Sequence, residues 1–185
     1  MKRYLSIITF LLCFATVTLA QEETRLGFNL TTNFDTYKTI KPEFGLVFEK
    51  RATEHSGIEL GLNYRTYYRE MLLLINNTAY YPFVSERYIT VPVTYKYYSK
   101  IINVSGGLSF DYFAGWRQTG GEIDLTSYRP GERYYAGLLA KVSREISVGS
   151  NFLLEPELKF NALLIPYSRF YGGVGIVGKF RLGRE

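Results

Sequence analysis

Few residues of this 185-residue chain could carry acid–base or nucleophilic chemistry. His55 is the only histidine and Cys13 is the only cysteine. A catalytic nucleophile needs a general base beside it, and His55 falls in an expected short turn away from any such partner. Metal sites built from several imidazoles or thiolates are excluded by the same counts. We therefore expect a protein that is not an enzyme and has no catalytic, cofactor-binding or metal-binding residue.

Two glutamates suggest paired carboxylates, which can act together as general acid and general base. Glu155 and Glu157 lie two positions apart, so they share one face of an expected β-strand. Lysines occur on the same face of neighbouring segments, at Lys141, Lys159 and Lys179. We favour ion pairs between these carboxylates and one or more of the three lysines over acid–base chemistry.

Most charged residues of the expected strands fall on this same face. They are Glu49, Glu59, Arg65, Arg69, Lys96, Asp111, Lys141, Glu155, Glu157, Lys159, Lys179 and Arg181. Opposite charges can pair across a narrow interior, where such pairs are near break-even in free energy but occupy the space. The pattern predicts a lumen that is filled and blocked by a charge network.

The elements that position these side chains are β-strands, because apolar and polar residues alternate with a period of two. Between residues 102 and 116, one side carries Ile102, Val104, Leu108, Phe110, Tyr112, Ala114 and Trp116. The other side carries Asn103, Ser105, Gly107, Ser109 and Asp111. This alternation indicates one long strand with an apolar face and a small, polar face.

The same pattern recurs eight times. We expect strands near residues 25–34, 42–50, 57–69, 86–98, 101–116, 133–144, 151–161 and 169–182. The connections after the second, fourth and sixth strands are short, and those after the third and fifth are long. Outer-membrane barrels have short periplasmic turns and longer external loops. The fold class that we predict is all-β, an eight-stranded antiparallel up-and-down transmembrane β-barrel.

The residue types decide which face looks outward. Large apolar side chains such as Phe28, Leu30, Phe44 and Ile176 share one face, and glycine, asparagine and serine share the other. The interior of an eight-stranded barrel is just wide enough for side chains to fill, so the large set would overfill it. We expect the apolar face to meet lipid. Outward aromatic residues at both strand ends, among them Trp116, would form two girdles at headgroup level.

The first residues resemble a secretory leader. Lys2 and Arg3 precede an apolar run over residues 4–17, and Ala20 ends a segment suited to signal-peptidase cleavage. The run is shorter than the ~20 residues of a membrane-spanning helix, which disfavours an uncleaved anchor. We expect a cleaved signal peptide at 1–20 and an outer-membrane barrel domain at 21–185. Removing two positive charges lowers the formal net charge from +5 to about +3, and the bases are scattered among acids, so nucleic-acid binding has little support.

Three segments resemble a known family. They are the run from Tyr88 through Pro92 to Tyr97, the layout of residues 108–116 followed by a polar loop and residues 135–142, and the closing run over 171–175. This pattern is similar to that of the bacterial outer-membrane β-barrel family that includes PorT-like proteins. The resemblance covers essentially the whole mature chain and implies an eight-stranded outer-membrane barrel without catalytic residues. It also implies a link to protein secretion, by analogy alone. Pro92, which cannot donate a ladder hydrogen bond, is expected to mark a bulge or kink.

The long connection over residues 70–85 is unusually apolar. Seven of its residues form a candidate partner-binding loop: Met71, Leu72, Leu73, Leu74, Tyr80, Tyr81 and Phe83. Exposed apolar patches tend to mark interaction sites, and Asn76-Asn77-Thr78 suits a hairpin tip. The alternatives are that these residues extend the lipid-facing wall or pack under the loop over residues 117–132. Arg117, Arg129 and Arg133 could contact lipopolysaccharide phosphates, although solvated loop charges are the commoner case.

Together these features favour a non-enzymatic outer-membrane protein of a Gram-negative bacterium, with a structural or loop-mediated recognition role. Its expected partners are outer-membrane lipid, lipopolysaccharide, or an extracellular or secretion-related protein. The first alternative is a narrow or gated diffusion pore with porin-like transport. A soluble lipocalin-like binder would need an apolar cavity, and an outer-membrane enzyme would need a base, so both are less favoured.

Overall fold

The computed structural model describes residues 23–34, 40–126, 128–129, 132–165 and 169–182. The expected signal peptide at 1–20, Cys13 included, lies outside the described residues. No helix among the described residues is long and apolar enough to cross a membrane.

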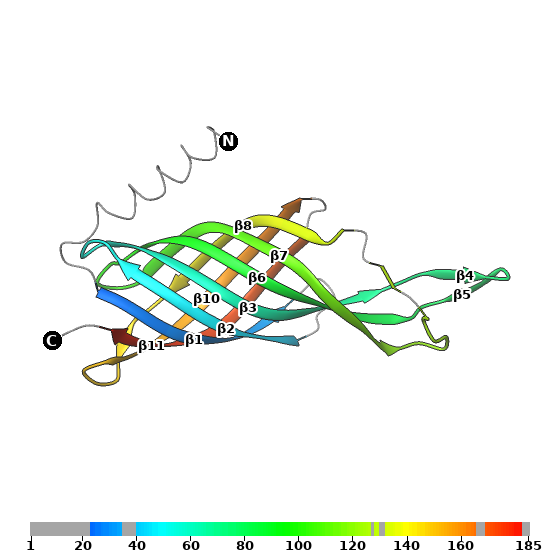
Figure 1. The fold of residues 1–185 in the computed structure, drawn as a ribbon, viewed down its shortest axis with the longest axis horizontal. Helices are drawn as coiled ribbons and strands as arrows, with labels where there is room; N and C mark the ends of the chain where they lie inside the picture. Colours follow the sequence, from blue (N-terminus) through cyan, green and yellow to red (C-terminus); the bar gives the residue numbers. More distant parts are fainter. Residues whose placement is uncertain (1–22, 35–39, 127, 130–131, 166–168, 183–185) are drawn as a thin grey trace, which may run out of the picture.

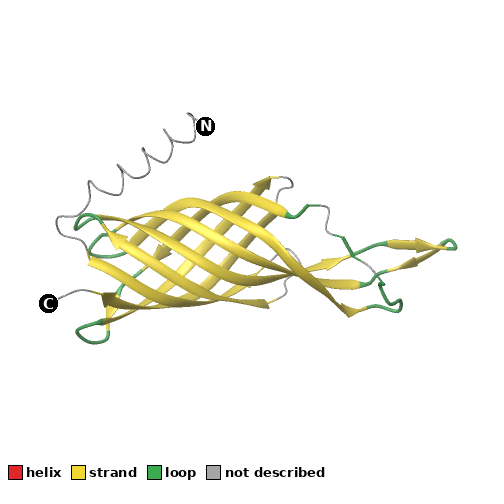
Figure 2. Ribbon diagram, in the orientation of Figure 1, coloured by secondary structure: helices red, strands yellow, loops and turns green. Residues whose placement is uncertain are grey.

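The described residues form one closed ring of strands and two small additions (Figures 1 and 2). The ring consists of β1 (Glu23–Phe34), β2 (Ile40–Arg51), β3 (Ser56–Glu70), β6 (Phe83–Tyr97), β7 (Asn103–Gly120), β8 (Tyr134–Ser143), β10 (Phe152–Ile165) and β11 (Arg169–Leu182). Each pairs antiparallel with the next, and β11 also pairs with β1, which closes the ring. The additions are a hairpin of β4 (Leu73–Ile75) and β5 (Thr78–Tyr80), and the short β9 (Ile146–Ser147) beside β10. The eight expected strands and their up-and-down order are confirmed.

The outer wall of the ring is apolar in every strand. Exposed outward residues include Phe28, Leu46, Leu60, Val93, Phe110, Leu138, Leu158 and Ile176. Leu30 is 60% exposed, whereas the inward Lys96 and Lys179 are 0% exposed. A soluble protein would show the reverse distribution, because burying an unpaired charge costs far more than exposing a leucine. The expected face assignment is confirmed. The chain folds as an eight-stranded transmembrane β-barrel.

The two ends of the barrel differ. At one end, here called the turn end, lie the short connections 52–55, 98–102 and 144–151, together with the start of β1 and the end of β11 (Figure 1). At the other, the loop end, the β4–β5 hairpin (residues 71–82) and the described residues 121–126 of the next long connection extend beyond the ring. The predicted rhythm of short and long connections is confirmed for these segments. His55 is exposed in the first turn, where its Nδ1 lies 3.3 Å from the Tyr98 carbonyl oxygen.

A β-bulge near the loop end reverses the alternation of β7. Tyr88 on β6 lies opposite Phe113, but the preceding Arg87 lies opposite Gly115, so β7 has one extra residue between them. Trp116 therefore lies opposite the inward, buried Glu86. Our expectation that Trp116 faces outward in the girdle is wrong, because one extra residue moves every later side chain to the other face.

Of the bulge or kink expected at Pro92, the strand register excludes the bulge. The pairing of β3 with β6 keeps one register on both sides of the proline, with Leu60 opposite Val93 and Asn63 opposite Thr90. The ladder between these pairs is interrupted, because Pro92 has no N–H to donate. A small residue accommodates the ring: a Cβ on Gly61 would lie 2.7 Å from the Pro92 Cγ. The proline thus removes hydrogen bonds without shifting the strands.

Candidate functional site: the lumen and the loop end

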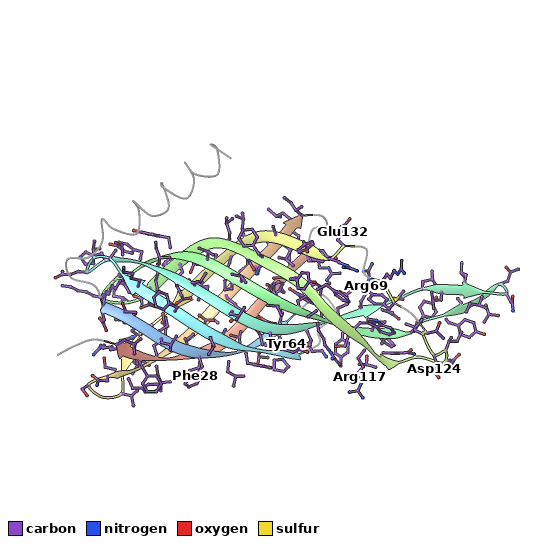
Figure 3. The ribbon with its side chains drawn as sticks, in the orientation of Figure 1. Phe28, Tyr64, Arg69, Arg117, Asp124 and Glu132 are labelled. Atoms are coloured by element: carbon purple, nitrogen blue, oxygen red, sulfur yellow. The ribbon has the colours of Figure 1, made fainter. Side chains whose placement is uncertain are left out.

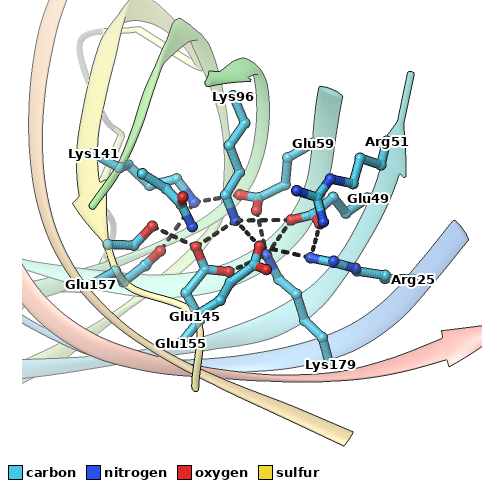
Figure 4. A network of polar contacts seen from close by, with 12 residues as sticks. Arg25, Glu49, Arg51, Glu59, Lys96, Lys141, Glu145, Glu155, Glu157 and Lys179 are labelled. Carbon is cyan, nitrogen blue, oxygen red and sulfur yellow. Dashed lines mark hydrogen bonds and ion pairs between the residues drawn. The ribbon is translucent and has the colours of Figure 1, made fainter. Parts of the chain in front are cut away.

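Lys179 is the centre of a buried ion network in the half of the lumen near the turn end (Figure 4). It lies on β11, and its Nζ donates to Glu49 at 2.5 Å, Glu59 at 2.8 Å and Glu155 at 2.5 Å. These carboxylates come from β2, β3 and β10, so one ammonium ties four strands across the lumen. An ammonium offers three donors, and all three are used here.

Further cations surround the same carboxylates. Lys96 on β6 donates to Glu49 at 3.0 Å and also contacts Glu155. Arg25 on β1 lies 2.7 Å from Glu49. Lys141 on β8 contacts Glu59. Each carboxylate of the centre therefore has at least two cationic partners, and breaking one pair leaves another in place.

A second ion group lies farther toward the loop end. Glu43 on β2 accepts from Lys159 at 2.7 Å and from the side-chain amides of Asn33 and Asn63 at 2.9 Å each. Arg65 on β3 pairs with Asp111 and lies 3.9 Å from Glu43. The two groups together fill the lumen with paired charges from most strands of the ring.

Ten of the twelve residues expected in the lumen network are buried in it, and two lie at its ends. The side chain of Arg69 is 43% exposed at the loop end, 3.6 Å from Glu86. Arg181 lies at the turn end, 2.7 Å from Glu23. Glu157 pairs with Lys141 at 3.1 Å, which is one of the pairings that we favoured.

Sequence reasoning missed four members: Arg25, Glu43, Glu86 and Glu145. The period-two alternation could have identified Arg25 and Glu43, because each lies two residues before a glycine of the inward face, Gly27 or Gly45. Among the described residues, the buried charges comprise six cations and seven carboxylates. They are Arg25, Arg65, Lys96, Lys141, Lys159 and Lys179, against Glu43, Glu49, Glu59, Glu86, Asp111, Glu155 and Glu157. This near-balance is what makes so many buried charges tolerable.

A layer of aromatic rings closes the lumen above the second ion group. It consists of Tyr67, Tyr88, Tyr135 and Tyr171 with Leu163, and Phe113 packs against it. Tyr67 meets Tyr88 at 5.2 Å and Tyr171 at 5.6 Å between ring centroids, both edge to face. The Arg65 guanidinium lies 4.5 Å from the Tyr171 centroid, which joins this aromatic layer to the ions below. The sequence did not reveal this layer, because we assigned only small and polar residues to the inward face.

Tyr128, a described residue of the connection 121–133, adds a lid over this layer. Tyr128 is 9% exposed, its ring packs on Trp116 at 5.4 Å, and its hydroxyl donates to Glu86. Glu86 also accepts from the Tyr88 hydroxyl at 2.9 Å and from Arg169 at 3.2 Å. Burial and the bond to Glu86 raise the pKa of Tyr128, so its phenol stays a donor at neutral pH. The lid therefore rests on a hydrogen bond that persists across the physiological range.

A small cavity lies between the ion groups, lined by described residues of the lumen. Its volume is about 20 Å³, enough for about one water molecule. Several polar atoms without a hydrogen-bond partner in the described part of the chain line it, among them Asn29 Oδ1, Thr90 Oγ1 and Ser109 Oγ. A single water could satisfy two or three of them. A cavity of this size is not a continuous path.

Three lumen carboxylates lie close enough to share a metal ion. Oxygens of Glu49, Glu145 and Glu155 fall within 4.8 Å of one another. The Lys96 ammonium already lies 3.0 Å from Glu49 and 3.5 Å from Glu145, and it contacts Glu155 as well. The cation of this cluster is therefore supplied by the protein's own lysine.

The β4–β5 hairpin projects well beyond the ring (Figure 1). Asn76 and Asn77 form its tip with φ of 50° and 60°, the left-handed values of a type I′ turn, so the expected hairpin tip is confirmed. Of the seven residues of the candidate partner-binding loop, Leu72, Leu74, Tyr81 and Phe83 are exposed, and Met71, Leu73 and Tyr80 are half-buried. Leu74 is 71% exposed. The exposure of Leu72, Leu74 and Tyr81 fits an interaction surface, while Pro82 at the base of the hairpin lies against Gly121 of the connection 121–133.

The three arginines that we considered as phosphate contacts, Arg117, Arg129 and Arg133, are all exposed at the loop end. Figure 3 shows Arg117 on the outer side of the barrel, beyond Tyr64. Arg69, in the same view, lies at the mouth of the lumen.

Comparison with known proteins gives likenesses of structure only. No family model matches the chain, so the resemblance to PorT-like proteins is not supported by one. No curated protein matches either. Among solved structures, Ail of Yersinia pestis, in complex with the heparin analogue sucrose octasulfate, is 11% identical, with a TM-score of 0.49 over 87% of this chain and 97% of that one. Neisserial surface protein A is 10% identical, with a TM-score of 0.49 over 87% and 97%. The outer membrane protein OprG of Pseudomonas aeruginosa is 12% identical, with a TM-score of 0.48 over 87% and 96%.

Proposed function

We propose that this chain is a closed, non-enzymatic barrel of a Gram-negative outer membrane that recognises a protein partner through the β4–β5 hairpin. The observation that carries the proposal is the filling of the lumen. Ion groups around Lys179 and Glu43, the aromatic layer and the lid of Tyr128 follow one another from the turn end to the loop end. The cavity between the two ion groups, of about 20 Å³, is too small to form a path for ions through that layer.

The orientation follows from the two ends. Short turns and both ends of the ring sequence lie at the turn end, which supports a periplasmic position for that end. The loop end, with the hairpin and the connection 121–133, then faces the outside. The leader-like residues 1–20 support export across the inner membrane.

The hairpin is the part of the loop end best suited to recognition. It is a two-stranded sheet of its own, so the outer edges of β4 and β5 both carry unpaired backbone groups. Leu72, Leu74 and Tyr81 add exposed apolar side chains beside those edges. Such an edge fits a protein that adds a strand and covers the leucines, and the likeness to PorT-like sequences favours a secretion-related partner.

Partner capture tests the recognition role. A photo-crosslinker at Ala79, which is exposed on β5, would be used in cells with the wild-type chain and with Leu72→Ser/Leu74→Ser. We expect one crosslinked protein with the wild type and its loss in the double variant, while heat-dependent gel mobility shows that both barrels are folded. Thr119→Ser, a change of one exposed residue elsewhere at the loop end, is the matched control. Undiminished crosslinking in the double variant would contradict the proposal.

Solute uptake tests the closed lumen. Liposomes that contain the folded barrel should not swell in an isotonic solution of a small neutral sugar. The alternative of a gated pore is favoured by one observation, the single lid residue Tyr128 held by Glu86. If the lid were the gate, Tyr128→Ala would permit swelling. We expect none, because the aromatic layer and both ion groups remain beneath the lid.

A further inference from the structure

A row of outward side chains crosses the apolar wall near the loop end. Phe44, Tyr64, Ile89, Tyr112 and Tyr134 are successive cross-strand neighbours on β2, β3, β6, β7 and β8. The first two rings lie 5.3 Å apart and the last two 5.2 Å apart. Ile89 lies between the two aromatic pairs and is the only residue of the row without a ring. It therefore leaves a gap in the girdle.

The outer wall is hollowed on both sides of this gap. One hollow, of about 650 Å³, is lined by Ile89 together with Phe28, Leu30, Phe44, Leu62 and Tyr64. The other, of about 250 Å³, is lined by Ile89 together with Val91, Phe110, Tyr134 and Ile165. Both are open and apolar, so both suit hydrocarbon chains. Their shared residue, Ile89, separates two chains that would descend side by side.

Arg87 lies directly above the gap. It is the next outward residue of β6 toward the loop end, and its cross-strand neighbours are Thr66 on β3 and Gly115 on β7. A Cβ on Gly115 would meet no atom within 4 Å, so the outer surface at this neighbour of Arg87 is open. Arg117 lies opposite Ser85, two residues along β6, and is thus a diagonal neighbour of Arg87. Diagonal pairs lie about 7–8 Å apart, so two long side chains can reach one ligand.

These two arginines have no protein counter-charge. Within the described ranges, neither the Arg87 nor the Arg117 side chain has a carboxylate within ion-pair distance, whereas Arg25, Arg65, Arg69, Arg169 and Arg181 all do. Guanidinium groups bind phosphate through two parallel hydrogen bonds. A pair of free arginines just above an aromatic girdle is placed at the depth of lipid headgroups.

We propose that Arg87, Arg117 and the two hollows beside Ile89 form a binding site for lipid A, the acylated and phosphorylated disaccharide of the outer leaflet. Its phosphate monoester binds Arg87 and Arg117, and two of its acyl chains lie in the hollows. Two unpaired positive charges match the dianion of a monoester better than the single charge of a phosphodiester. The inference rests on the proposed function, because it needs the loop end to face the outer leaflet.

Titration of the folded barrel in detergent micelles tests the site. The ligands are lipid A, lipid A with its phosphates removed, and phosphatidylglycerol. The variants are Arg87→Gln, Arg117→Gln and, as matched control, Arg144→Gln, an exposed arginine of the connection 144–151 at the turn end. Gel mobility before and after heating verifies folding of each. We expect the Kd for lipid A to rise about tenfold in Arg87→Gln and to change little in Arg144→Gln.

The hollows have their own variant. Ile89→Trp keeps both arginines and fills the gap between the hollows, so it should weaken the binding of lipid A. Removal of the phosphates should then weaken binding to this variant by a smaller factor than it weakens binding to the wild type.

Equal affinities of the wild type and Arg87→Gln would overturn the site. Equal binding of phosphorylated and dephosphorylated lipid A would also overturn it. If phosphatidylglycerol bound as tightly as lipid A, the preference of the site for a phosphate monoester over a phosphodiester would be refuted. A barrel that conducts ions but still loses lipid A binding in Arg87→Gln would contradict the closed lumen and support this site.

Discussion

Replacement of Lys179 by methionine removes the centre of the ion network. Its ammonium lies 2.5, 2.8 and 2.5 Å from Glu49, Glu59 and Glu155, and all four side chains are buried. Removal of one partner of a buried pair costs about 3–5 kcal/mol, because the remaining charge is left uncompensated. Here each carboxylate keeps another cation, Lys96, Arg25 or Lys141, so we expect the lower end, about 3 kcal/mol.

The assay is urea-dependent unfolding of the barrel in lipid vesicles, followed by gel mobility, for four proteins: wild type, Lys179→Met, Glu59→Gln and the double variant. Loss of Glu59 together with Lys179 removes one positive and one negative charge, so the double variant should recover at least about 1 kcal/mol relative to the additive sum. A cost below about 0.5 kcal/mol for Lys179→Met would refute the reasoning. Strict additivity in the cycle would refute it equally, because it would mean that the pair is not coupled.

Three further predictions concern the wall, the lumen and the lid. Leu108→Arg, outward in the middle of β7, should destabilise the folded barrel by about 2–4 kcal/mol in urea titrations. Val104→Arg, on the same face at the turn end, should destabilise it by at most about 1 kcal/mol. Equal costs would contradict the claim that Leu108 lies deeper in the membrane than Val104. Gly61→Val should lower the unfolding free energy by about 1–3 kcal/mol, because its side chain would overlap Pro92; a neutral effect would mean that the strands separate freely. Tyr128→Phe loses only the hydroxyl that donates to Glu86, and should speed proteolysis of the connection 121–133 while the ring stays intact. An unchanged rate of cleavage would contradict the claim that this hydrogen bond holds Tyr128 in place as a lid.

The sequence predicted the ring because a barrel strand in a membrane has only two environments. Lipid accepts Phe28 or Leu158 and rejects Lys179, so a period of two was sufficient to place these residues and to find all eight strands. The same parity placed Arg25 and Glu43 inward, although our list of network members omitted both. Which carboxylate pairs with which lysine depends on strand register, which the alternation leaves open; Lys159, for example, pairs with Glu43 on a strand far away in sequence.

Local irregularities account for what the sequence did not reveal. One extra residue near Ala114 moved Trp116 inward, and nothing in the alternation up to residue 116 signals this bulge. Tyrosines suit the interior and the girdle alike, so Tyr67 and Tyr171 gave no sign that they form a layer across the lumen. The gap at Ile89 and the free Arg87 above it became visible only when the cross-strand neighbours were known.

Single-channel conductance of the folded protein in planar bilayers tests the closed lumen most directly. Heat-dependent gel mobility and protease digestion of the loop end would first establish that the barrel is folded and inserted. The ion groups, the aromatic layer and the lid predict a silent bilayer over the whole range of applied voltage. Steady openings whose size scales with salt concentration would mean that a water path passes the buried charges, and the account of a closed barrel would be wrong.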